Sequence, residues 1–166
     1  MNPRHATTAL RSTLFLAAVA LSALALRPLP LFAATNACSL VKAADVTALF
    51  GGAATQKPTP GGTSCSWIGA DGKHKLAVLE YRNRPGVPAD MMYMGARKNA
   101  EGEDGKATDE AGIGDRAFSL PVSFGVVFIS MKAGRVIQLQ YYTGGHGTAK
   151  DVAALRPIVR KAVAAF

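Results

Sequence analysis

The stretch AFSLPVSFGVVFISMKAGRVIQLQYY, residues 117–142, decides the fold of this 166-residue chain. It is rich in Val, Phe and Ile, which favour strands because their side chains pack well on a pleated surface. Ala133 and Gly134 divide it into two runs, 117–132 and 135–142. Two such runs joined by a short glycine-containing turn predict a β-hairpin.

A second hairpin is predicted upstream of this stretch. Cys65 and Trp67 alternate with serines, and the turn-forming sequence 70–72 separates them from the apolar run 76–81. The preceding segment 57–62, KPTPGG, is predicted to be a loop, because prolines lack a backbone donor and glycines cost conformational entropy.

Helices are predicted on either side of these hairpins. Apolar residues at 46, 49 and 50 follow helical spacing and stop at Gly51, and the Ala, Met and Arg content of 89–100 favours a second helix. Thr148 and Asp151 predict a capping box that starts a last helix, in which Pro157 should produce a bend. The order helix, hairpin, helix, hairpin, helix predicts an α+β fold, with a single layer of antiparallel sheet from two hairpins covered by helices on one face.

Residues 1–34 have the pattern of a secretory signal peptide. Arg4 and Arg11 precede the apolar run 12–26, which is too short to span a bilayer, and small residues such as Ala33 and Ala34 follow. We therefore expect residues 35–166 to form a single α+β domain that is periplasmic or secreted, with no transmembrane span after signal removal.

The net positive charge of the chain does not by itself indicate which class of partner the protein binds. The chain has 19 basic and 11 acidic residues, for a net charge of +8. Three of the arginines lie in the leader, so residues 35–166 carry a net charge of +5. The remaining basic residues are scattered from Lys42 to Lys161, without the aromatic-interleaved stripe that nucleic-acid binding requires, and we expect no nucleic-acid partner.

Cys38 and Cys65 are the only cysteines. In an oxidising compartment a lone pair at this spacing favours one structural disulfide. Free or intermolecular thiols, or a catalytic or metal role, are the alternatives.

Several short motifs resemble a family of small exported bacterial domains of unknown function, best known from actinobacterial lipoproteins. The similarity covers nearly the whole of 35–166, and it implies a Cys38–Cys65 bridge and an α+β fold with no assigned reaction. The chain lacks the extra upstream cysteine on which family members are often lipidated, and we expect no lipid anchor. The matching motifs are CSLV at 38–41, FG at 50–51, CSW at 65–67, GIGDRA at 112–117, and an Ala-rich last helix.

The candidate ligand site is the loop formed by Gly144, Gly145, His146 and Gly147. Consecutive backbone N–H groups before a helix attract anions, and His146 adds a charge that can switch near neutrality. The alternative is a plain connection between strand and helix.

Two other functions are alternatives to ligand binding by this loop. Met91 and Met94 share a helix face and offer thioether ligands for copper(I), although methionine is also an ordinary core residue. An enzyme of unrecognised type would use His146. Asp71 with His74, or Asp115 with Glu110, could supply an acid and base pair. The sequence contains neither a nucleophile elbow nor a zinc-protease motif.

The sequence therefore predicts an exported, non-enzymatic binding or envelope-associated domain. We expect no catalytic residue, metal or cofactor. The expected partner is an unknown protein, an envelope component or a small anionic ligand.

Overall fold

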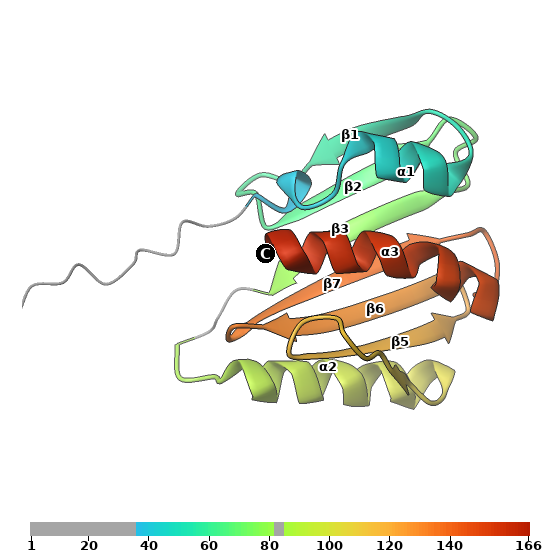
Figure 1. The fold of residues 1–166 in the computed structure, drawn as a ribbon. Coiled ribbons are helices and arrows are strands. Elements are labelled where there is room, and N and C mark those ends of the chain that lie inside the picture. The colour runs from blue at the N-terminus through green and yellow to red at the C-terminus, as the bar shows by residue number, and fades with distance from the viewer. Residues whose placement is uncertain (1–35, 82–84) are drawn as a thin grey trace, which may run out of the picture. The chain divides into compact units, whose positions relative to one another are not determined.

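The hairpin expected at 117–142 is one part of a seven-stranded antiparallel sheet (Figure 1). The computed structural model describes residues 36–81 and 85–166. Its elements are a 3-10 turn η1 (Ala37–Ser39), α1 (Ala43–Phe50), β1 (Ala54–Pro58), β2 (Ser64–Gly69), β3 (Lys75–Tyr81), α2 (Ala89–Asp104), β4 (Thr108–Asp109), β5 (Arg116–Val122), β6 (Gly125–Lys132), β7 (Arg135–Tyr142) and α3 (Ala149–Ala165).

The strands are ordered β1-β2-β3-β7-β6-β5-β4 across the sheet. The β2–β3 hairpin joins the β5–β6–β7 meander where β3 pairs with β7, with Val78 opposite Leu139. The last strand in sequence is therefore the middle strand of the sheet. The predicted α+β fold and antiparallel sheet are confirmed.

The sheet contains more strands than two hairpins supply. Residues 117–132 turn at Ser123 and Phe124 and so form two strands, β5 and β6. The prediction that 57–62 holds no regular element is wrong for Lys57 and Pro58, which end β1. Because β1 is an edge strand, a proline there removes no internal ladder hydrogen bond.

The two sheet faces are covered differently. Along each strand, alternate residues enter one of two apolar clusters. The first, on what we call the closed face, includes Phe128 and Leu139 and packs under η1, α1 and α3. The second, on the grooved face, includes Phe118 and Ile129 and packs under α2, which has its main contacts with β5, β6 and β7. The expectation of helices on one face is therefore wrong for α2.

The predicted end of α1 and the predicted start of α3 are confirmed, whereas α2 runs on to Asp104, beyond the predicted range 89–100. Gly51 ends α1 in the left-handed conformation, with φ of 69°. The Thr148 hydroxyl accepts from the Asp151 backbone N–H at 3.3 Å, and the Asp151 carboxylate accepts from the Thr148 N–H at 2.9 Å. Pro157 lies within α3, which runs on through it to Ala165, so the helix is not split.

The Cys38–Cys65 disulfide is present, with Cα atoms 4.9 Å apart. It joins η1 to β2 on the closed face, and Cys65 is fully buried there. This confirms the predicted bridge.

All described residues fall in one compact unit. Among them no helix has the length and apolar character needed to cross a membrane. The predicted signal peptide, 1–34, lies outside the described residues.

Candidate functional site

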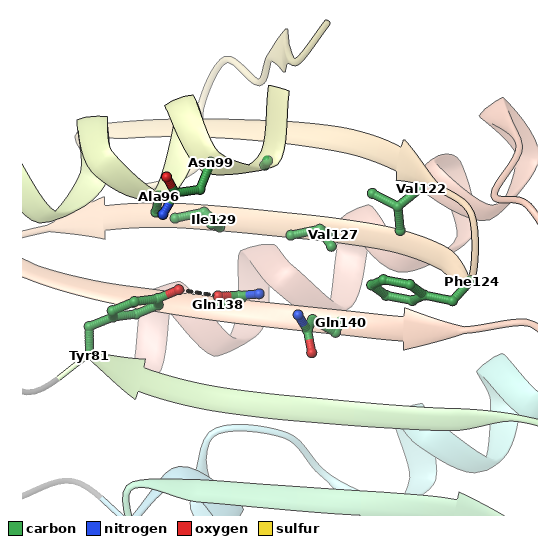
Figure 2. A pocket seen from close by; sticks show the side chains of 10 residues that line it. Tyr81, Ala96, Asn99, Val122, Phe124, Val127, Ile129, Gln138 and Gln140 are labelled. Atoms are coloured by element: carbon green, nitrogen blue, oxygen red, sulfur yellow. Dashed lines mark hydrogen bonds between the residues drawn. The ribbon is translucent and has the colours of Figure 1, made fainter. Parts of the chain in front are cut away.

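The grooved face carries a pocket of about 240 Å³ between α2 and the middle of the sheet (Figure 2). The pocket forms because α2 packs on β5 to β7 and not over the neighbouring strands β1 to β3. Strand β7 therefore lies at the border between the covered and the uncovered part of this face. The lining residues are uncharged: Tyr81, Ala96, Asn99, Ala100, Val122, Phe124, Val127, Ile129, Gln138 and Gln140.

Two glutamines on β7 form the floor of this groove. Gln138 and Gln140 are two residues apart on one strand, so both side chains point to the same face. Gln138 is only 8% exposed although it lies in a sheet with an apolar core. Figure 2 shows the two carboxamides side by side, with Tyr81 at one end of the groove and Phe124 at the other.

Each glutamine is oriented by a tyrosine. The Tyr81 hydroxyl donates to Gln138 Oε1, and the Tyr142 hydroxyl donates to Gln140 Oε1 at 3.0 Å. Burial raises the pKa of Tyr81 above its usual value of 10.0, so its hydroxyl stays a donor at neutral pH. Within 36–81 and 85–166, neither amide nitrogen donates a hydrogen bond to another residue. The groove floor thus offers two free NH2 groups.

The walls are apolar or small. Ala96 and Ala100 are one turn apart on α2 and pack partly against the second cluster, and Asn99 lies between them at the rim. At the far end Phe124 stacks on Tyr142 with ring centroids 4.8 Å apart. The Lys75 ammonium lies 5.2 Å from the centre of the Tyr142 ring, outside the lining. The site therefore combines apolar walls with neutral donors.

The predicted loop site lies next to this groove. The Thr143 N–H donates to the Phe124 carbonyl at 3.2 Å, and the Gly147 N–H donates to the Val122 carbonyl at 2.9 Å. Both bonds attach the loop to the turn that carries Phe124. Gly147 is buried, and a Cβ atom there would overlap the Gly125 carbonyl. A close approach of two backbones therefore requires this glycine.

Two of the polar groups at this helix start are already hydrogen-bonded within the fold. The Asp151 carboxylate already accepts from the Thr148 N–H and hydroxyl at the start of α3, and the Gly147 N–H is used by Val122. His146 is exposed, with Nδ1 2.9 Å from the Gly147 carbonyl. Ligand binding by Gly144, Gly145, His146 and Gly147 stays a prediction.

The methionines considered for copper lie on the outer side of α2. Met91 is 62% exposed and Met94 is 49% exposed, and Met94 Sδ lies 3.5 Å from the Arg116 guanidinium. His74 packs with Phe50 and Tyr141 of the closed face, so it does not join them. The positive charge of Arg116 beside the Met94 thioether disfavours the binding of a copper(I) ion there.

The acid and base pairs considered for catalysis have structural partners. Hydrogen bonds from His74 and Lys73 hold the pKa of Asp71 at about 2, against a usual 3.8, so Asp71 is a turn carboxylate. Asp115 accepts from the Ala133 N–H at 2.7 Å. Glu110 is not paired with it but accepts from both Arg156 and Ser119.

Comparison of the chain with protein-family models, curated proteins and solved structures gives no match. The resemblance to exported actinobacterial domains stays a prediction.

Sequence reasoning missed the groove. The available signal is the run VIQLQYY at 136–142, in which glutamines occupy alternate positions of an otherwise apolar and aromatic strand. Alternation places both amides on one face, but only the position of α2 shows that this face is half covered.

Proposed function

We propose that this chain is an exported, non-catalytic binding domain that holds an uncharged ligand in the groove between α2 and β7. The observation that carries the proposal is the pair of oriented carboxamides with free NH2 groups, set in a pocket that none of the charged residues within 36–81 and 85–166 lines. The amide nitrogens donate to none of the described residues, so they are available to a ligand that accepts hydrogen bonds.

Binding is favoured over chemistry by the lining itself. Acyl or phosphoryl transfer needs a nucleophile, a base and an orienting group. The described residues that line the groove supply amides, a phenol with a raised pKa and apolar side chains, and none of them is a Ser, Cys, His, Asp, Glu or Lys. These groups can orient a ligand but have no means of activating it.

A rigid frame supports the same proposal. Gln138 and Gln140 lie on the middle strand, hydrogen-bonded to β3 and β6 on either side. A site built on a central strand loses little conformational freedom when it binds. Export to the periplasm or outside rests on the leader sequence and agrees with the disulfide, which persists in oxidising compartments.

Occlusion of the groove tests the proposal. The protein would be exposed to arrayed neutral oligosaccharides and uncharged, end-capped peptides. Asn99→Trp places an indole over the groove, while Lys98→Trp places one at the neighbouring exposed position, outside the lining. We expect at least one uncharged probe to bind and Asn99→Trp to weaken it at least tenfold, with Lys98→Trp close to wild type. Absence of binding, or equal effects of the two variants, would refute the proposal.

A further inference from the structure

Resting on that proposed function, we infer that the ligand is an extended, uncharged peptide segment that lies along β7 and is held through its backbone by Gln138 and Gln140. The partner is thus another polypeptide, recognised in a strand-like conformation on the sheet face.

The spacing of the two donors carries this inference. Residues i and i+2 of a strand are separated by about 6.6 to 6.8 Å, so the Cα atoms from which the Gln138 and Gln140 side chains extend lie at that interval. In an extended peptide, the backbone groups that point to one side repeat at the same interval. A peptide parallel or antiparallel to β7 therefore meets both amides in register.

The hydrogen-bonding capacity also matches a peptide backbone. Every second residue of an extended chain presents one C=O and one N–H on the same edge. Each glutamine has a free NH2 group to donate to the carbonyl, and its oxygen, which accepts once from a tyrosine, has a second lone pair for the N–H. One carboxamide can thus satisfy one peptide residue with two bonds.

The walls set the character of the peptide side chains. Ala96 and Ala100 lie on one face of α2 at a spacing of four residues and leave space beside the floor. Val122 and Val127 make the deep end apolar. Since no charged residue within 36–81 and 85–166 lines the groove, a charged side chain would lose its hydration without gaining a partner among them. The segment is therefore uncharged, with small or apolar residues toward α2.

The sheet edges are poorer sites for the same peptide. At one edge β1 carries Lys57 and ends in Pro58, which has no N–H to donate. At the other edge β4 has two residues, Thr108 and Asp109. Short strands, lysine and proline are the features that protect an edge from strand addition. The grooved face, where Gln138 and Gln140 have free NH2 groups, is therefore better suited to bind a peptide than either sheet edge.

A display library of random nine-residue peptides would supply the probe. Selected peptides would be synthesised with capped ends, and their affinity for the mature protein measured by calorimetry. Gln140→Glu replaces the donor NH2 by an acceptor on the groove floor. Gln56→Glu makes the same amide-to-carboxylate change on β1, away from the groove, where the Gln56 NH2 donates to the Cys38 carbonyl at 3.2 Å and residue 56 pairs with Trp67 of the closed face. We expect Gln140→Glu to weaken binding at least tenfold and Gln56→Glu to change it less than twofold.

Backbone recognition is tested by N-methylating the peptide one residue at a time. We expect affinity to fall at alternate residues, with a period of two. A peptide that binds without this period, or without dependence on Gln140, would overturn the inference.

The arrayed oligosaccharides separate the two proposals. If a neutral oligosaccharide is blocked by Asn99→Trp and no peptide is selected, the groove is a binding site and the peptide inference is wrong. If neither class binds in the groove, both proposals are wrong.

Discussion

The closed face and the grooved face are built from the same strands, yet only one is sealed. Val46 of α1 and Leu155 of α3 are fully buried on the closed face, where the disulfide also lies. On the grooved face α2 seals Phe118 and Ile129 but stops short of β3, where Leu79 is 39% exposed. Stability is thus concentrated on one face, and surface available for recognition is left on the other.

The difference lies in what covers each strand. On β7, Ile137 and Leu139 enter the closed-face cluster, while Gln138 and Gln140 alternate with them toward the groove. A fully covered strand requires apolar residues, because a buried amide needs partners. A strand at the border of a helix can carry amides, since its side chains reach both tyrosines and open space.

The largest expected effect is on the closed face. Replacing Cys38 and Cys65 by serine removes a bridge between residues 27 positions apart, and chain entropy predicts a loss of about 3.5 kcal/mol of unfolding free energy. Urea unfolding of the double variant measures it. An unchanged midpoint would show that the bridge contributes nothing to this face.

Gly147→Ala should come next, because this residue lies where α3 of the closed face meets the turn that borders the groove. The added Cβ would overlap the Gly125 carbonyl, and overpacking predicts a loss of about 3 kcal/mol. Gly145→Ala is the control, since nothing lies within 4 Å of its Cβ position. Thermal unfolding of both variants tests this, and equal melting temperatures would contradict it.

Acidification should lower the free energy of unfolding, because protonation of Glu110 removes its ion pair with Arg156 on the closed face. The Arg156 guanidinium, which donates at 2.7 and 2.9 Å, lowers the pKa of Glu110 below its usual 4.5. The resulting stability is present above pH 4.5 and is lost as the pH falls through the lowered pKa.

Glu110→Gln checks this pH dependence. It should cost about 2 kcal/mol at neutral pH, because a charge-assisted hydrogen bond is lost. It should also make unfolding free energy less dependent on pH below 4.5 than in the wild type. Parallel pH slopes for the two proteins would exclude Glu110 as the source.

The smallest effect is expected in the groove. Gln140 is only partly buried, so Gln140→Ala should change the unfolding free energy by less than about 0.5 kcal/mol. Chemical denaturation measures this, with Leu139→Ala as the neighbouring closed-face substitution, which should cost about 3 kcal/mol. A large loss from Gln140→Ala would mean that the amide serves stability rather than recognition.

Much of the fold was predictable because its signals are local. Glycine after an apolar helix, the Thr148–Asp151 capping box and alternating strands each depend on a few neighbouring residues, and each was confirmed. Strand β1 was missed because Pro58 normally argues against a strand, and its edge position removes the objection.

The ionic contacts were less predictable. Glu110 and Arg156 are 46 residues apart, and no spacing in the sequence relates them. In the sequence Arg156 is one of several basic residues of the last helix, and nothing marks Glu110 as its partner. In the structure its guanidinium binds the Glu110 carboxylate, which joins the segment before β5 to α3.

The amino-acid sequence by itself determined the α+β class, the end of α1, the start of α3, the two main turns and the pairing of Cys38 with Cys65, because periodicity, caps and a lone cysteine pair act over short range or leave one choice. Only the tertiary structure decided that α2 lies on the opposite face from α1 and α3, and that β7 is central. Side-chain alternation assigns residues to two faces but does not say which helix covers either one. That choice leaves Gln138 and Gln140 at the border of a groove.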